Sequence, residues 1–241
     1  MAARFRIGTS GWSYKHWKGT FFPEDLKQKE WFGYYMEQFD TLEINNTFYN
    51  LPEKKTFRKW RDETPENFLF SVKAGRYITH MKKLKEPKDS LNTFLDRTRE
   101  LKEKLGPILF QLPPNLKKNS DRLRNFLALL PDNHRYVFEF RNETWFDDET
   151  YGILSDHGAA FCVYQLGGVT SPTVHTAPFA YVRLHGPLGK YEGSYSESEL
   201  QRWRQIFAGW ERDTDTVYCY FDNDQNGYAP RNALSLLGII H

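Results

Sequence analysis

The amino-acid sequence predicts an α/β chain folded as a single (β/α)8 TIM-like barrel over residues 1–241. Short apolar runs typical of buried strands alternate with segments that carry apolar residues at helical spacing. The alternation recurs about every 30 residues, the size of one βα unit. A length of 241 residues is ordinary for one such barrel, and no linker or low-complexity stretch marks a second domain.

Eight runs are predicted as strands. Because helical segments separate them, we expect the strands to pair in parallel, and closing the sheet into a barrel removes its edges. The eight runs are Phe5–Ser10, Thr41–Asn46, Phe68–Ala74, Ile108–Leu112, Tyr136–Arg141, Ala159–Gln165, Phe179–His185 and Val217–Asp222.

Three of the intervening segments show a clear helical repeat of apolar residues. The repeats are Leu91, Phe94, Leu95, Thr98, Leu101 and Leu105; Leu123, Phe126, Leu127 and Leu130; and Leu200, Trp203, Phe207 and Trp210. Ser196 and Glu199 predict a capping box before the third. Leu166–Pro178 is rich in Gly, Thr, Ser and Pro and is predicted to lack a helix, so the barrel is expected to be irregular after strand six. An open α/β sheet is the alternative.

Composition limits the setting in which the protein works. Cys162 and Cys219 lie in apolar runs. We therefore expect both side chains to pack as small buried hydrophobic groups, in a protein that works in a reducing compartment. Met1–Gly8 lacks the apolar core of a signal peptide, and no stretch reaches membrane-spanning length. We therefore expect a cytoplasmic protein with no membrane partner. The net charge of +2 is too small to imply a nucleic-acid partner, which is not favoured.

Charged residues interrupt the predicted strands. Parallel strands of a barrel are buried on both faces and normally read as continuous apolar runs. Residues two apart share a strand face, so Glu139 and Arg141 are expected to point the same way, as are Arg183 and His185. The charged and polar positions in question are Glu43, Lys73, Gln111, Glu139, Arg141, Arg183, His185 and Asp222.

Two interpretations of these residues stay open. Buried charges persist only when paired, so they can form a self-satisfied ion network that fills the barrel. A functional site at the carboxyl ends of the strands is favoured, because barrel interiors are normally apolar and barrel active sites are built there. The segments after the strands also supply candidate ligand contacts, namely Trp12, Tyr14, Asn45, Tyr49, His80, Trp145 and Asn223.

Seven short segments, in order along the chain, resemble the YecE-like family, which contains domain of unknown function 72 (DUF72). They are Gly8–Tyr14; Leu42–Tyr49; Phe70–Lys73 with Thr79 and His80; Gly106 and Pro107 with Gln111–Pro114; Glu139–Arg141 with Trp145; Tyr181–Gly186; and Tyr220–Asp224 with Gly227–Ala229. The resemblance implies a TIM barrel and no particular activity. One departure is Asp222, where the family usually has Asn, and it adds a carboxylate to the site.

The favoured function is acid/base chemistry, without a metal, on a small substrate that carries phosphate or carboxylate. Lys73, Arg141 and Arg183 are predicted to bind the anion, with Glu43, Glu139, His185 and Asp222 as the catalytic set.

Three alternatives stay open. A metal-dependent phosphodiesterase or isomerase acting on nucleic acid or sugar has suitable ligand types, but the interleaved cations would repel a divalent metal. A glycoside hydrolase would use Glu43 and Glu139 as its two carboxylates. A non-enzymatic ligand-binding protein is the last. The oligomeric state is not predicted.

Overall fold

The computed structural model describes residues 3–240, in which strands and helices alternate along the chain. They divide into two compact units. Unit 1 comprises the described residues up to Glu43 together with those from Val163 onward, and unit 2 is Ile44–Cys162. The divisions fall inside strands β2 (Thr41–Ile44) and β6 (Ala160–Leu166), not in linkers. The single-domain assignment stays a prediction.

Unit 1 is built on parallel strands. Strand β1 (Arg4–Thr9) pairs in parallel with β9 (Thr216–Phe221), and β9 pairs in parallel with β8 (Phe179–Leu184). A parallel bridge between Ser10 and Glu43 brings β2 to the end of β1. The helices are α1 (Trp31–Gln38), α6 (Glu197–Trp210) and α7 (Tyr228–Ile240), with 3-10 turns η1 (Lys15–Trp17), η2 (Gln28–Glu30) and η7 (Gln225–Gly227). Helix α7 packs on α6, β1 and β9.

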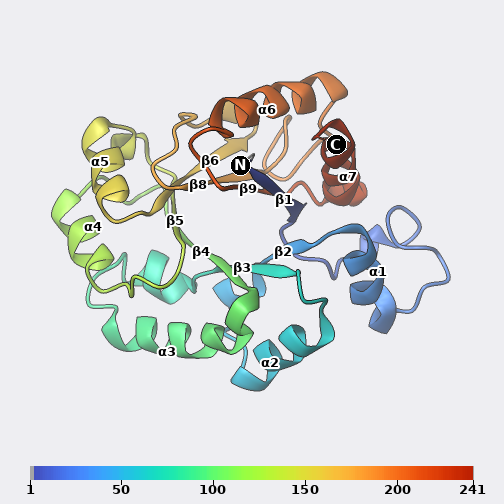
Figure 1. The fold of residues 1–241 in the computed structure, drawn as a ribbon, viewed down its shortest axis with the longest axis horizontal. Helices are drawn as coiled ribbons and strands as arrows, with labels where there is room; N and C mark the ends of the chain where they lie inside the picture. The colour runs from blue at the N-terminus through green and yellow to red at the C-terminus, as the bar shows by residue number, and fades with distance from the viewer. Residues whose placement is uncertain (1–2, 241) are drawn as a thin grey trace. The chain divides into compact units, whose positions relative to one another are not determined.

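Unit 2 repeats the same alternation. Strands β3 (Leu69–Lys73), β4 (Leu105–Leu112) and β5 (Tyr136–Phe140) pair in parallel, and β5 pairs with the start of β6. The helices are α2 (Lys54–Glu63), α3 (Lys88–Thr98), α4 (Ser120–Leu127) and α5 (Asp148–Asp156), with 3-10 turns η3 (Asn46–Phe48), η5 (Arg99–Lys104) and η6 (Glu143–Trp145) and a π-helical turn η4 (Tyr77–Met81). Helix α3 lies beside α2, and α4 lies beside α5 (Figure 1).

The eight predicted strands are all present, and most ends agree within two residues. One helix prediction is wrong at its end: the apolar repeat ran to Leu105, but α3 ends at Thr98 and Leu105 begins β4. The chain continues past Thr98 as the 3-10 turn η5, and the φ of 52° at Lys102 ends the helical path before Leu105. Leu130 likewise lies beyond α4.

Two local predictions are confirmed in unit 1. The capping box of α6 forms, with the Ser196 side chain accepting from the Glu199 amide. Leu166–Pro178 contains no helix; β6 instead turns at Gly167 and Gly168 into the short strand β7 (Val169–Thr170), with which it pairs antiparallel.

Both cysteines are buried free thiols. Across residues 3–240, none of the helices has the length and apolar character to span a membrane.

Strand β8 places its polar side chains on one face. Every residue of β8 is buried, yet Tyr181, Arg183 and the following His185 alternate with the apolar Val182 and Leu184. Arg183 and His185 both bond to Asp222, so the predicted shared face is confirmed.

Candidate functional site

Polar side chains gather at the carboxyl ends of the strands in each unit. In unit 1 they form a group that we call the buried ion cluster, consisting of Ser10, Glu43, Arg183, His185 and Asp222. In unit 2 they form a group that we call the cationic cluster, consisting of Lys73, Arg76, His80 and Arg141. The two clusters differ in their balance of charge.

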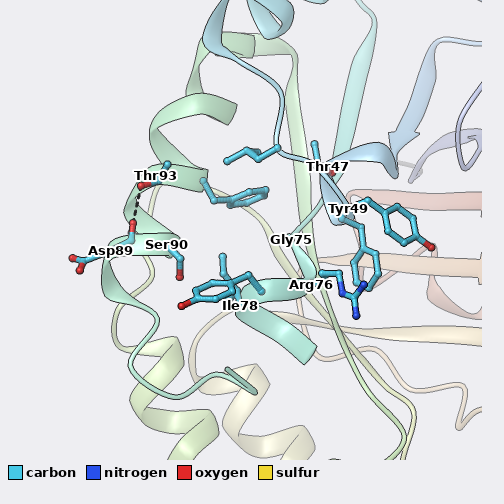
Figure 2. Close-up of a pocket in the computed structure, with 12 residues that line it drawn as sticks. Thr47, Tyr49, Gly75, Arg76, Ile78, Asp89, Ser90 and Thr93 are labelled. Carbon is cyan, nitrogen blue, oxygen red and sulfur yellow. Dashed lines mark hydrogen bonds between the residues drawn. The ribbon is translucent and has the colours of Figure 1, made fainter. Parts of the chain in front are cut away.

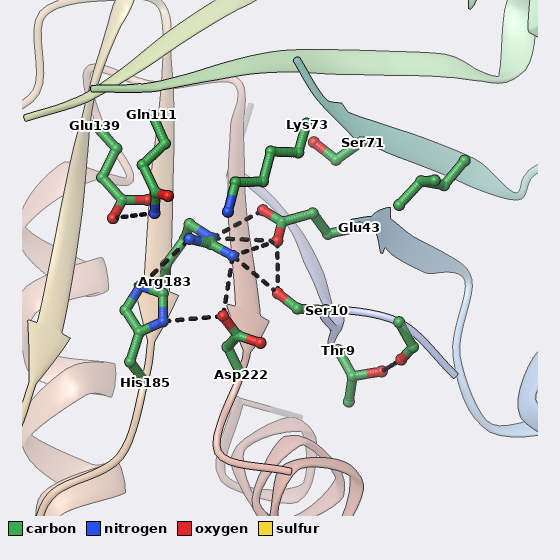
Figure 3. A network of polar contacts seen from close by, with 12 residues as sticks. Thr9, Ser10, Glu43, Ser71, Lys73, Gln111, Glu139, Arg183, His185 and Asp222 are labelled. Atoms are coloured by element: carbon green, nitrogen blue, oxygen red, sulfur yellow. Dashed lines mark hydrogen bonds and ion pairs between the residues drawn. The ribbon is translucent and has the colours of Figure 1, made fainter. Parts of the chain in front are cut away.

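Arg183 is the centre of the buried ion cluster (Figure 3). Its side chain is fully buried, and its Nη2 donates to Glu43 Oε1 at 2.7 Å and to Asp222 Oδ2 at 3.1 Å. Its Nε donates to both Glu43 oxygens, at 3.1 and 3.0 Å. Ser10 Oγ and the Tyr181 hydroxyl complete the coordination of Glu43, at 2.5 and 2.6 Å. Glu43 thus accepts bonds on both oxygens from partners that stabilise its charge.

The hydrogen bonds of His185 fix its tautomer. Nη1 of Arg183 lies 3.3 Å from Nε2 of His185, and a guanidinium only donates, so Nε2 accepts and carries no proton. The proton therefore lies on Nδ1, which donates to Asp222 Oδ2 at 3.0 Å. His185 is thus a fully buried imidazole that links Asp222 to Arg183, and both of its nitrogens are engaged by the protein.

The pKa of Tyr14 depends on the charges of this cluster. Its hydroxyl donates to the Ser10 carbonyl at 2.8 Å. Burial raises the pKa of Tyr14, and Asp222, Asp224 and Glu43 raise it further, whereas Arg183 opposes them. Carboxylates therefore dominate the field at the Tyr14 hydroxyl, which does not favour an anionic ligand there.

The cationic cluster has the opposite balance. Lys73 ends β3 and is 7% exposed, with its Nζ 4.5 Å from the centre of the Phe48 ring. Arg141 follows β5 and pairs through Nε with Oε1 of the fully buried Glu139. Glu139 Oε1 also accepts from Gln111 Nε2 at 2.9 Å, and this contact is drawn in Figure 3. Glu139 Oε2 lies 4.0 Å from Cys162 Sγ. Glu139 thus fixes the orientation of the Arg141 guanidinium.

His80 stands in the π-helical turn η4 beside these cations. Thr79 Oγ1 donates to the Gly75 carbonyl at 3.2 Å, so it accepts from His80 Nδ1 at 2.9 Å. The proton of neutral His80 therefore lies on Nδ1. Within residues 3–240, no hydrogen-bond partner of Nε2 is found. Burial lowers the pKa of His80, and Lys73, Arg76 and Arg141 lower it further against Glu139.

Comparison with known proteins gives the family. A family model described as "Protein of unknown function DUF72" matches residues 6–241. The chain belongs to the DUF72 family. UPF0759 protein YunF of Bacillus subtilis is 26% identical, with 97% of this chain and 94% of its own length covered. UPF0759 protein YecE of Escherichia coli K12 is 29% identical, with 81% and 80% covered.

Solved members of the DUF72 family share the fold. A DUF72 family protein from Thermotoga maritima is 30% identical and matches with a TM-score of 0.89, covering 98% of this chain and 99% of its own. One from Enterococcus faecalis, at 17% identity and a TM-score of 0.82, covers 98% and 95% and is alike in fold alone. The predicted family and the predicted TIM-like (β/α)8 fold class are confirmed.

Other predicted contact residues of this DUF72 chain have packing or local roles. Trp145 is 1% exposed, stacks on Phe140 at 4.7 Å and donates its indole N–H to the Leu116 carbonyl at 2.8 Å, which favours a place in the core. The Trp12 ring lies 4.8 Å from that of Phe32.

Three more of these residues lie just beyond strand ends. Asn223 donates to the Gly193 carbonyl and to Asn232, so its amide fastens a loop of unit 1. Tyr49 is 78% exposed. Asn45 keeps a buried Oδ1 without a partner in the described chain.

Sequence reasoning missed several side chains that shape these clusters, among them Tyr181 and Thr79. The Tyr181 hydroxyl binds Glu43, and the Thr79 hydroxyl sets the tautomer of His80. Tyr181 lies two residues before Arg183 on the same face of β8, and this period-two spacing was a usable signal. Among residues 3–240, no group of three or more His, Cys, Asp or Glu side chains is arranged to hold a metal ion.

The titration of His80 tests the charge balance of the cationic cluster. We expect its NMR titration midpoint to lie below the ordinary value of about 6.5, and Lys73→Met to move it upward because one repelling charge is removed. Since the folded pKa lies below the unfolded one, the stability from neutral His80 is present above about pH 6.5 and is lost as pH falls through the folded pKa. His80→Gln assigns the resonance. A midpoint at or above that of a free histidine would contradict the expectation.

Proposed function

We propose that the protein is an enzyme that binds a small phosphate- or carboxylate-bearing substrate at its cationic cluster and performs acid/base chemistry there. The observation that carries the proposal is the state of His80. A neutral imidazole whose Nε2 lone pair is not used by the protein stands among three cationic side chains with one opposing carboxylate. A general base needs an unprotonated nitrogen at working pH, and an anion needs the cations.

The anion-binding part rests on Lys73, Arg76 and Arg141. All three lower the pKa of His80, so each contributes positive potential at its ring. Arg141 is oriented through its ion pair with buried Glu139, and its positive charge is thereby held in a fixed place in the cluster. Arg183, which the sequence also suggested, has all three nitrogens directed at protein acceptors and does not enter the proposal as an anion ligand.

The acid/base part rests on His80 and Thr79. The Thr79 hydroxyl keeps the proton of His80 on Nδ1, as a carboxylate or carbonyl does for many catalytic histidines. Nε2 is then the nitrogen that takes a proton from the substrate. Once protonated, His80 adds a fourth positive charge beside the bound anion, which stabilises the anionic state of the substrate.

Titration calorimetry with inorganic phosphate and with sulfate tests the proposal. Lys73→Met is expected to weaken binding of both anions by about tenfold to hundredfold, the equivalent of one charge-assisted hydrogen bond. The matched control is Lys55→Met, an exposed lysine in α2 that changes net charge equally. Sulfate keeps its charge across the mildly acidic range, so any proton taken up on binding belongs to the protein. Wild type is expected to take up that proton, and His80→Gln is not.

Two outcomes would overturn the proposal. The first is that the wild-type protein binds neither phosphate, sulfate nor any compound in a panel of sugar phosphates at millimolar concentration. The second is that Lys73→Met and Lys55→Met weaken binding equally, because the effect would then come from net charge and not from the cluster.

A further inference from the structure

A pocket of about 430 Å³ opens in unit 2 next to the cationic cluster. It lies between the turn η3, the segment that follows β3, and the first two turns of α3, as Figure 2 shows. This volume is in the range of small-molecule sites.

Aromatic side chains form much of the wall. Phe48, Tyr49, Tyr77 and Phe94 line the pocket. Phe94 is buried, whereas Tyr49 is 78% and Tyr77 48% exposed. Large aromatic groups left exposed around a concavity are typical of ligand contacts, because they offer flat apolar area at low entropic cost.

The pocket is electrically polarised along its length. Arg76 lies at one end and Asp89 at the other, as seen in Figure 2. Arg76 is exposed and forms no ion pair within the described part of the chain. A ligand anion is therefore attracted to the Arg76 end and repelled from the Asp89 end, which orients any charged molecule that enters.

Phe48 joins the pocket to the cationic cluster. Its ring lines the pocket, lies 4.5 Å from Lys73 Nζ and is 4.9 Å from the His80 ring in edge-to-face contact. Arg76 belongs to both groups, since it lines the pocket and lowers the pKa of His80. A ring in the pocket and an anion at the cluster are thus within the reach of one small molecule.

The backbone of this region is held in uncommon conformations. His80 and Tyr77 stand in a π-helical turn, and Lys83, Leu84 and Glu86 follow with φ of 50°, 64° and 44°. Single π-helical turns and left-handed residues other than glycine have a conformational cost and are concentrated at functional sites. This backbone places Tyr77 at the pocket and His80 beside Lys73 and Phe48.

We propose that this pocket is a subsite for the aromatic ring of an aryl anion, with the ring between Phe48, Tyr77 and Phe94 and the phosphate or carboxylate toward Arg76 and Lys73. The inference rests on the proposed function and adds the substrate class to it. The ring stacks or packs on the aromatic walls, while its anionic substituent enters the field of the cationic cluster. Aliphatic anions of the same charge leave the pocket empty.

The experiment compares phenyl phosphate with methyl phosphate, each titrated into the full-length protein. We expect phenyl phosphate to bind about tenfold to hundredfold more tightly, as burial of one ring predicts. Thr93→Phe fills the pocket from α3 and is expected to erase this preference. The matched control is Asn92→Phe, one residue earlier on the same helix and exposed outside the pocket, which is expected to retain the preference.

The outcomes separate this inference from the function on which it rests. If methyl phosphate binds and phenyl phosphate binds no more tightly, the aromatic subsite is wrong and the anion site stands. The aromatic subsite is also wrong, and the anion site stands, if the Thr93→Phe variant still binds phenyl phosphate more tightly than methyl phosphate. If neither ester nor inorganic phosphate binds, the proposed function fails and the subsite falls with it.

Discussion

Replacing Arg183 with methionine is expected to lower the free energy of unfolding by about 3–5 kcal/mol. The guanidinium is fully buried and bonds to Glu43, His185 and Asp222. Methionine fills a similar volume but leaves two carboxylates without their cation, and an uncompensated buried charge is far more costly than an absent pair. Urea unfolding followed by tryptophan fluorescence measures the change.

Two further variants test whether burial causes this effect. Arg58→Met removes an exposed ion pair with Glu100, at 2.7 Å in the structure, and is expected to cost less than about 1 kcal/mol. The double variant Glu43→Gln with Arg183→Met is expected to cost less than the sum of the single changes, because the second change removes a charge that the first left unpaired. An Arg183→Met protein as stable as Arg58→Met would contradict the expectation that burial makes the loss of this cation costly.

The expected result bears on which residues are available for chemistry. A guanidinium that bonds to two carboxylates and an imidazole has little capacity left for a ligand, whereas Arg76 is exposed and has no ion-pair partner in residues 3–240. The use of ring nitrogens by the protein likewise distinguishes His185 from His80. His185 uses both nitrogens within the protein, and His80 uses only Nδ1. For this reason the proposed chemistry lies with the cationic cluster.

The sequence was sufficient to predict the strands and the polar positions within them. Apolar runs of strand length separated by helical repeats leave few alternatives to a parallel α/β fold, and the period of two placed Arg183 and His185 on one face. These signals are local, and they depend on the side chains of a few consecutive residues.

Pairing and burial were beyond the reach of the same reasoning. The sequence does not distinguish Glu43 from Asp222 as a partner for Arg183, and only the register between strands shows that both carboxylates bind it. Trp145 reads like any other aromatic residue after a strand, yet it is buried against Phe140. The positive φ at Lys102 ends the helical path before Leu105. The residue at this position is neither glycine nor proline, so the sequence gives no sign of the turn.

Replacing Gly8 with alanine is expected to destabilise the protein by about 2–4 kcal/mol, although it adds only one methyl group. An alanine Cβ at this position would lie 2.4 Å from the Thr41 carbonyl oxygen and 3.0 Å from the Tyr35 hydroxyl. That hydroxyl accepts from the Thr9 amide at 3.0 Å and donates to the Thr41 carbonyl at 3.0 Å, so it joins β1 to the start of β2. Both strands have to shift, or these hydrogen bonds have to break.

Gly33→Ala provides the matched control, measured by the same urea unfolding. Gly33 is an exposed residue of α1, and nothing lies within 4 Å of the added Cβ. Alanine there removes the helix penalty of glycine and is expected to stabilise the protein by about 0.5–1 kcal/mol. The same chemical change therefore has opposite signs at two sites in unit 1. Equal effects would mean that Gly8 acts through backbone entropy alone, and that β1 and β2 do not need the close approach that brings Ser10 to Glu43.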